Sequence, residues 1–178
     1  MNTINRYLLL LLSLFCLHAQ AAMVLTNGAG KITGATDVIV DGESYSVNFI
    51  DGSCIDLYSG CDENSDFVFN TLDQAAAASQ ALLDQVFIDI APNSFDLDPE
   101  NTVGCTNSGL CRALTLYALS STAWTSAGAT ADNNAVEAND IVTLNIGVGD
   151  GLDLNAVSIA TYAVWPANPS PVPLPASI

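Results

Sequence analysis

The stretch TLDQAAAASQALLDQV, residues 71–86, contains the clearest helix signal in the chain. Thr71 can cap the start of this helix, and Gln74 completes a T-x-x-Q capping box. An apolar stripe recurs at helical spacing and comprises Leu72, Ala75, Ala76, Ser79, Leu82, Leu83 and Val86. We expect this stripe to pack on a β-sheet, although a partner-binding helix would show the same pattern.

The segments around the helix have the patterns of β-strands. Residues 37–40 and 45–50, joined by Asp41-Gly42-Glu43, predict a hairpin whose second arm alternates apolar and polar side chains. Further strands are expected at 113–119, 140–146 and 157–164. Residues 120–139, rich in Ser, Thr, Ala and Asn, predict a long surface loop. Together these elements predict an α+β fold: a mainly antiparallel sheet, or partial sandwich, with one amphipathic helix packed on it.

The first 21 residues have the three parts of a secretory signal peptide. Arg6 is the only charge before an apolar run over residues 7–17, and Ala19-Gln20-Ala21 forms an A-x-A cleavage pattern. The run is about half the ~20 residues that a membrane-spanning helix requires. Cys16 follows Phe15 rather than a small residue, which argues against a lipoprotein signal. We expect signal peptidase to remove residues 1–21 and leave a single globular domain over 22–165, outside the cytoplasm.

The scarcity of basic residues and of histidine argues against some partners and some kinds of catalysis. The sequence has 3 Lys and Arg against 19 Asp and Glu, a net charge of −16. Removal of Arg6 leaves only Lys31 and Arg112 as cations and a net charge of −17. Nucleic acid is therefore not an expected partner, because phosphate binding needs clustered basic side chains. His18 leaves with the signal peptide, so neither a Ser-His-Asp nor a Cys-His arrangement can form, and we expect no enzymatic activity.

Four cysteines remain after removal of the signal: Cys54, Cys61, Cys105 and Cys111. Three pairings are possible for four cysteines, and the sequence alone does not choose among them. Proximity in the sequence and an oxidising compartment favour disulfides Cys54–Cys61 and Cys105–Cys111. The alternative is a zinc site with four thiolates, whose ligand pairs are usually closer in sequence.

Three acidic clusters could supply oxygen ligands to Ca²⁺, which is the candidate cofactor. The first contains Asp62, Asn64 and Asp66, the second contains Asp96, Asp98 and Glu100, and the third contains Asp150, Asp153 and Asn155. Oxygen donors at alternating loop positions are typical of Ca²⁺ sites. None is a complete EF-hand, since Phe67 stands where the first cluster would need Gly and the distal Glu is missing. Solvated acidic loops are the alternative interpretation.

A Pro-rich linker over residues 166–178 ends in a short motif, Val172-Pro173-Leu174-Pro175-Ala176. This string resembles the VPLPA variant of the PEP-CTERM sorting signal, with Leu174 where the family name has Glu. The resemblance implies an exported Gram-negative protein that an exosortase-type enzyme processes, often beside exopolysaccharide functions. We expect the reading frame beyond Ile178 to encode ~20 apolar residues followed by a Lys/Arg cluster.

Two functions remain open at this point. The first is a non-enzymatic surface or extracellular-matrix protein in a polysaccharide-rich envelope. The second is a carbohydrate-binding module that uses Trp124, Trp165 or Tyr58 as a stacking platform, although core packing is the more ordinary role of such aromatic residues.

Overall fold

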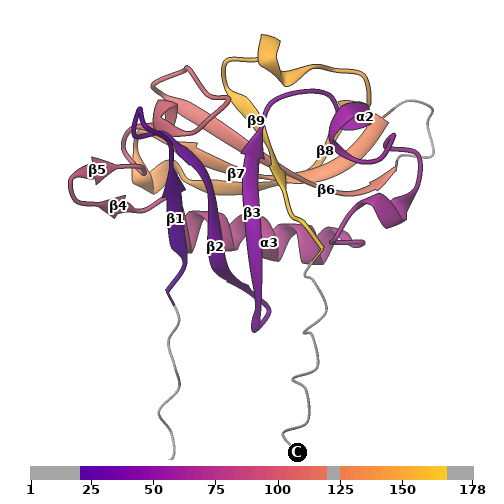
Figure 1. Ribbon diagram of the computed structural model, residues 1–178, viewed down its shortest axis with the longest axis horizontal. Coiled ribbons are helices and arrows are strands. Elements are labelled where there is room, and N and C mark those ends of the chain that lie inside the picture. Colours follow the sequence, from indigo (N-terminus) through magenta and orange to yellow (C-terminus); the bar gives the residue numbers. More distant parts are fainter. Residues whose placement is uncertain (1–20, 120–124, 168–178) are drawn as a thin grey trace, which may run out of the picture.

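The structure is a computed structural model that describes residues 21–119 and 125–167, and it is built around one seven-stranded sheet (Figure 1). Its strands are β1 (Met23–Thr26), β2 (Ile32–Val40), β3 (Glu43–Ile50), β6 (Leu110–Leu119), β7 (Thr125–Asn134), β8 (Ile141–Gly149) and β9 (Ala160–Val164). Their spatial order is β1-β2-β3-β9-β6-β7-β8. Neighbouring strands are antiparallel except for the parallel pair β6 and β9. One long helix packs on this sheet, which confirms the predicted α+β class.

The predicted hairpin is confirmed as β2 and β3. Val40 pairs with Glu43, so the loop between them has two residues. Asp41 and Gly42 both have positive φ, 50° and 87°, as the turn type favoured by two-residue hairpins requires. The alternation in β3 buries Val47 and Phe49. The first arm is longer than predicted, because β2 begins at Ile32.

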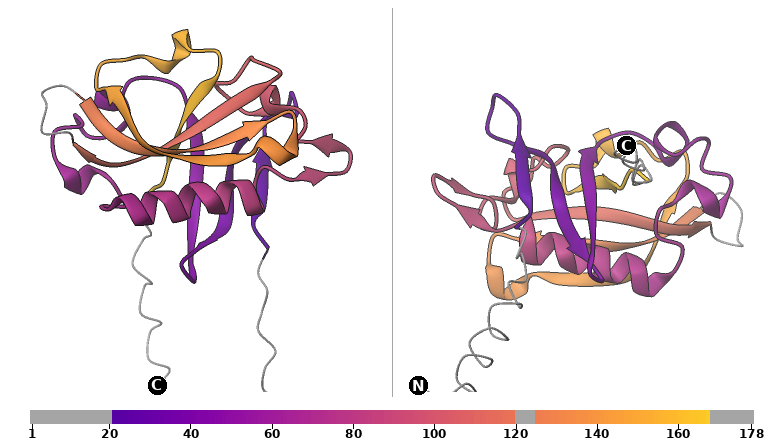
Figure 2. Two further views of the ribbon diagram at one scale, coloured as in Figure 1. Left: turned by 180° about the vertical axis from the view of Figure 1, so that it is seen from behind. Right: turned by 60° about the horizontal axis from the view of Figure 1, so that its bottom comes forward.

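The predicted helix is confirmed as α3 (Leu72–Gln85), which runs along one side of the sheet (Figure 2). Thr71 is its N-cap, and its hydroxyl accepts the Gln74 N–H at 3.3 Å. In a capping box the Gln74 side chain would accept the backbone N–H of Thr71. Here it accepts instead the N–H of Asn70, one residue before the cap.

The buried face of α3 differs in part from the predicted stripe. The buried residues are Ala75, Ala78, Ser79, Ala81 and Leu82, whereas Leu72, Ala76 and Leu83 are only partly buried. Ala78 and Ala81 belong to the same core cluster as Ala113 and Ala131, which pair across β6 and β7. Small side chains on both surfaces let the helix approach the sheet closely, so the alanines rather than Leu72 and Leu83 occupy the interface.

The prediction of a surface loop over residues 120–139 is wrong where β7 forms. This strand is hydrogen-bonded between β6 and β8, and Ser126, Ala129 and Ala131 are fully buried. Several of its buried polar side chains have partners within the protein: the Thr130 hydroxyl donates to Asp132 at 2.6 Å. The amide of Asn133 donates to the carbonyl of Phe95 at 2.9 Å. Hydrogen bonding of this kind removes most of the cost of burying polar groups.

Two core clusters lie on opposite faces of the sheet. Ala113 in β6 and Ala163 in β9 belong to the cluster that contains α3, whereas Leu114 and Tyr162, the adjacent residues, belong to the other. Successive side chains of a strand point to opposite faces. The second face is covered by three short helices, α2 (Cys54–Leu57), η1 (Asn64–Asp66) and η4 (Leu154–Ala156), with their flanking loops.

The remaining elements are short. The predicted strands at 140–146 and 157–164 are confirmed as β8 and β9, although β9 begins only at Ala160. A separate small hairpin is formed by β4 (Asp89–Ile90) and β5 (Asn93–Ser94). Two further 3-10 turns are η2 (Pro99–Asn101) and η3 (Glu137–Asn139). The predicted signal peptide up to residue 20, the motif at 172–176 and Trp124 lie outside the described residues.

Candidate functional site

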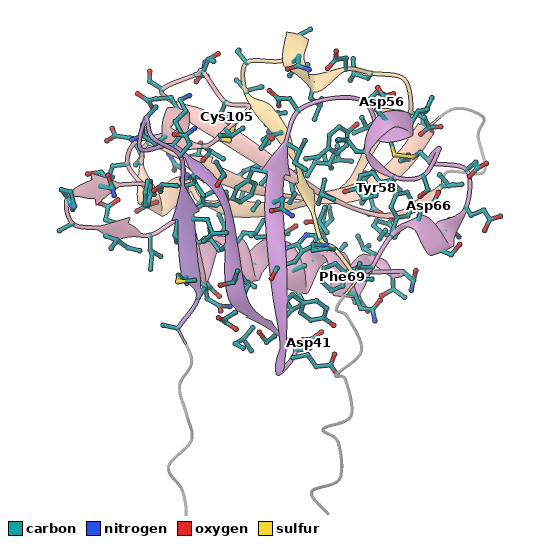
Figure 3. The ribbon with its side chains drawn as sticks, in the orientation of Figure 1. Asp41, Asp56, Tyr58, Asp66, Phe69 and Cys105 are labelled. Carbon is teal, nitrogen blue, oxygen red and sulfur yellow. A yellow bond between two sulfur atoms is a disulfide. The ribbon has the colours of Figure 1, made fainter. Side chains whose placement is uncertain are left out.

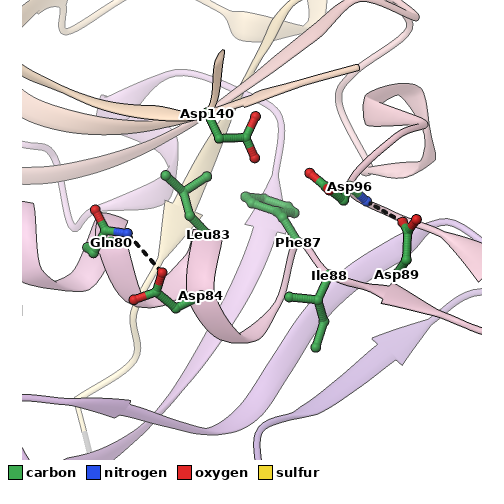
Figure 4. A pocket seen from close by; sticks show the side chains of 8 residues that line it. All are labelled: Gln80, Leu83, Asp84, Phe87, Ile88, Asp89, Asp96 and Asp140. Carbon is green, nitrogen blue, oxygen red and sulfur yellow. Dashed lines mark hydrogen bonds between the residues drawn. The ribbon is translucent and has the colours of Figure 1, made fainter. Parts of the chain in front are cut away.

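An acidic pocket of about 420 Å³ lies beside the end of α3 (Figure 4). The end of α3, the β4–β5 hairpin and the residue preceding β8 form its walls. The lining residues are Gln80, Leu83, Asp84, Phe87, Ile88, Asp89, Asp96 and Asp140. Four of these eight side chains are carboxylates and none is basic, so any charge in the lining is negative.

Hydrogen bonds hold three of these carboxylates in place. The Gln80 amide donates to Asp84 at 2.9 Å from one helical turn earlier. Asp89 accepts the backbone N–H of Asp96 at 3.1 Å across the small hairpin. Asp140 accepts the backbone N–H of Asn134, at the end of β7, at 2.7 Å. Oxygen-rich surfaces of this kind suit hard cations such as Ca²⁺.

The carboxylates of this pocket do not form a closely packed ligand set. Among the described residues, Cys54, Cys61 and Asp150 are the only group of three His, Cys, Asp or Glu side chains whose ligand atoms all lie within 4.8 Å of one another. The two sulfurs of that group are bonded to each other. A cation in the acidic pocket would therefore have to complete its coordination with water.

The structure separates the predicted calcium ligands. Only Asp96 of the second cluster lines the acidic pocket, whereas Asp98 is exposed on the surface and Glu100 lies in η2. The other pocket acids, Asp84, Asp89 and Asp140, were not predicted. Asp84 and Asp89 precede Asp96 in the same part of the chain, whereas Asp140 is far from them in sequence and is brought to the pocket only by the fold.

The first predicted cluster forms a tight turn around η1. Asp66 accepts the backbone N–H groups of Asp62 and Glu63 at 3.1 and 3.2 Å. Asn64 accepts the backbone N–H of Leu119 at 2.8 Å, which ties this turn to the end of β6. These oxygens have a structural role in the turn, and binding of Ca²⁺ there stays a prediction.

The third cluster caps η4 and adjoins a disulfide. Asp153 accepts both the backbone N–H and the side-chain amide of Asn155, at 2.9 and 2.8 Å. Asp150 accepts a hydrogen bond from the hydroxyl of Ser126 at 2.5 Å. That hydroxyl lies 3.0 Å from the sulfur of Cys61, so the pair packs directly against the cross-link.

The cysteines form the two predicted disulfides. Cys54–Cys61 and Cys105–Cys111 have Cα–Cα distances of 5.6 and 5.7 Å, within the usual range for a bridge. Each bridge closes a loop beside the sheet, and Figure 3 shows the first one between α2 and the loop that follows it. Because all four sulfurs are used, the alternative of a four-thiolate zinc site is wrong.

The predicted stacking platforms that the structure describes are both buried. Tyr58 is 8% exposed and lies between Phe67 and Tyr162, with ring centroids 5.2 and 6.2 Å away. Figure 3 shows Tyr58 directed into the interior below α2. Trp165 is 5% exposed, and its indole N–H donates to the hydroxyl of Thr115 at 3.0 Å. Both rings therefore serve mainly to fill the protein interior.

Comparison with known proteins identifies no relative of this chain. No family model matches it, and no curated protein or solved structure does so. In the part of the chain that the structure covers, no helix is both long and apolar enough to cross a membrane. The fold and site therefore define the protein only as a disulfide-linked, acidic α+β domain.

Proposed function

We propose that this protein is a non-enzymatic surface or extracellular-matrix protein, which a Gram-negative cell exports and sorts with an exosortase-type enzyme. The observation that carries this proposal is the pair of disulfides, Cys54–Cys61 and Cys105–Cys111. Structural disulfides form and persist in oxidising compartments outside the cytoplasm. They agree with the export signal in residues 1–21, whose three parts do not include any of these four cysteines.

The position of the last strand supports attachment through the Pro-rich segment that follows the domain. β9 is a central strand, hydrogen-bonded to β3 on one edge and to β6 on the other. Trp165 follows it directly and is fixed in the core by its bond to Thr115. Tension transmitted from an anchor through residues 166–178 would therefore act on a strand that pairs with β6 over residues 160–162 and with β3 over residues 162–164.

The charge distribution supports a role in a hydrated matrix. Both cations of the mature sequence are engaged within the fold: the ammonium of Lys31 donates to the carbonyl of Cys105 at 3.0 Å, and Arg112 pairs with Asp132. The remaining surface charge is almost entirely acidic. Strong net charge keeps a protein dispersed, and divalent cations could link such a surface to an anionic exopolysaccharide.

The proposal is tested by following the protein in the bacterium that encodes it. An epitope inserted after Gly28, an exposed loop position, reports surface access by antibody, and peptide mapping without reductant reports the bridges. The test variant replaces residues 172–175 with alanine, and the matched control replaces residues 168–170 in the same way. We expect the unaltered protein and the control to reach the surface with both bridges formed, and the test variant to accumulate unprocessed.

Two outcomes would contradict separate parts of the proposal. Reduced protein confined to the cytoplasm would contradict export. Normal processing of the variant altered at residues 172–175 would leave export intact and contradict sorting through this motif.

A further inference from the structure

A small apolar pocket lies on the face of the sheet opposite α3, beneath the loop that contains η4. Its volume is about 170 Å³. Leu114, Ile146 and Val148 contribute from the sheet, and Leu154 and Val157 contribute from the loop. An engineered apolar cavity of ~150 Å³ binds benzene, so a group of about that size would fit.

Arg112 is the basic residue in the lining of this pocket. Its side chain is 44% exposed, and its Nε donates to Asp132 at 3.3 Å. The Asp132 side chain is only 5% exposed and also accepts hydrogen bonds from the hydroxyls of Thr130 and Thr143, at 2.6 and 3.0 Å. Asp132 therefore accepts three hydrogen bonds from within the protein. Thr130 is the other polar residue of the lining, and its hydroxyl already donates its proton to Asp132.

The guanidinium of Arg112 has donors beyond the one that Asp132 uses. An arginine side chain carries five N–H groups in a planar fork, and only the Nε–H is committed in this ion pair. The fork matches the two oxygens of a carboxylate, which it binds more strongly than a neutral acceptor. Lys31, the other cation of the mature sequence, does not line the pocket and is bonded to the carbonyl of Cys105.

We propose that this pocket binds a small carboxylic acid whose apolar body, about the size of a benzene ring, fills it, while its carboxylate reaches the guanidinium of the partly exposed Arg112 side chain beside it. The body would fill the space bounded by Leu114, Val148 and Leu154, where no other polar donor competes. The net charge of −17 opposes binding of an anion anywhere on the protein, so affinity at this site depends on the direct bonds to the guanidinium. This binding proposal does not depend on whether the protein is exported.

The test uses 4-fluorobenzoate as the probe, with ¹⁹F NMR to measure its binding to the purified domain at physiological salt. For so small a ligand we expect saturable binding with a Kd on the order of 1 mM. The neutral analogue 4-fluorobenzyl alcohol should bind about tenfold more weakly, because it lacks the charge-assisted bonds to the guanidinium. Nuclear Overhauser contacts from the probe to the methyl groups of Val148 and Val157 should locate it in the pocket.

Two variants with a matched control separate this site from general association. Arg112→Gln should weaken binding of 4-fluorobenzoate at least about tenfold, whereas Lys31→Gln, which removes the other cation, should leave it unchanged. Ala160→Leu fills the pocket without removing either partner of the ion pair and should abolish binding even if Arg112→Gln fails to fold. Equal binding of the acid and the alcohol would overturn the proposal, as would retained binding in Ala160→Leu or no saturation up to about 10 mM.

Discussion

In β7, Gly128 lies at a position where the neighbouring strand leaves no room for a side chain. A Cβ atom added to it would lie 2.6 Å from Cδ1 of Leu114 and 2.9 Å from the backbone oxygen of Thr115. The leucine could change its rotamer, but the carbonyl is fixed by the β6–β7 pairing. Glycine here allows close approach of two backbones in the sheet.

We therefore expect Gly128→Ala to lower the free energy of unfolding by about 1–3 kcal/mol, the usual cost of overpacking a filled interior. Gly147 on β8 pairs with Ala127, and a Cβ there would meet nothing within 4 Å. Gly147→Ala is the matched control and should change stability by no more than about 0.5 kcal/mol. Urea denaturation of both variants measures the difference, and equal effects would contradict this account of β7.

We expect Tyr162 to make the stability of the folded protein depend on pH in the alkaline range. Its side chain is fully buried, and burial raises the pKa of its phenol from 10.0 to about 12, with the negative charge of Asp150 adding to the shift. Because the folded state holds this proton more tightly than the unfolded state, stability is intact below pH 10 and falls as the pH rises towards 12.

We expect Tyr162→Phe to retain more of its stability than the unaltered protein between pH 10 and pH 12, and to resemble it at pH 7. Urea midpoints at a series of pH values measure this difference, with tyrosinate absorbance reporting ionisation. Parallel loss of stability in the two proteins would exclude Tyr162 as the cause. Burial raises the pKa of Tyr58 as well, so some alkaline loss should persist in the variant.

At the scale of elements, contact between α3 and the sheet depends on small side chains. Ala78 is fully buried in the cluster that contains Ala113 and Ala131. Ala76, on the same helix, is only partly buried. This difference could not be inferred from the apolar stripe, in which Ala76 appeared as a core position and Ala78 did not.

We expect Ala78→Leu to destabilise the protein by about 1–3 kcal/mol, because three further carbons must enter a filled interface. Ala76→Leu adds the same atoms at a partly exposed site and should change stability by about 0.5 kcal/mol or less. Thermal or urea unfolding of the two variants decides between the observed and the predicted face. A larger effect at Ala76 would favour the predicted one.

At the scale of the whole molecule, the acidic surface makes stability depend on the salt in the solution. The carboxylates repel one another in the folded state, and salts of any kind should screen this repulsion. A specific cation site would add to this general screening. The acidic pocket formed by Asp84, Asp89, Asp96 and Asp140 is the strongest candidate that the structure offers.

We expect millimolar Ca²⁺ to raise the melting temperature by roughly 2–4 °C more than Mg²⁺ or NaCl at matched ionic strength, since a ligand of the folded state stabilises it. Asp84→Asn, in the pocket, should reduce this excess. Asp98→Asn removes an equal charge from an exposed position outside the pocket and should leave it intact. Equal shifts with all three salts would argue for screening alone.

Local features of the molecule could be predicted from the sequence because they depend on residues close together in the chain. The turn at Asp41-Gly42 needs two residues that tolerate positive φ, and both are present. The cap at Thr71 bonds three residues ahead. The two disulfides close loops with sequence separations of 7 and 6. Such short-range interactions are available before the rest of the chain has folded.

The tertiary structure decided what depends on distant neighbours. β7 contains Ser, Ala, Gly, Thr and Asn, which resembles a loop by composition, and its burial follows from lying between β6 and β8 beneath α3. The same close packing determines which alanines of α3 face the sheet. The acidic pocket combines carboxylates separated by up to 56 positions, from Asp84 to Asp140, and the apolar pocket lies under a loop that follows β8. A sequence pattern reports the periodicity of a single helix or strand. The burial of β7, the buried face of α3 and the two pockets depend instead on the shapes of the neighbouring elements that pack against each other.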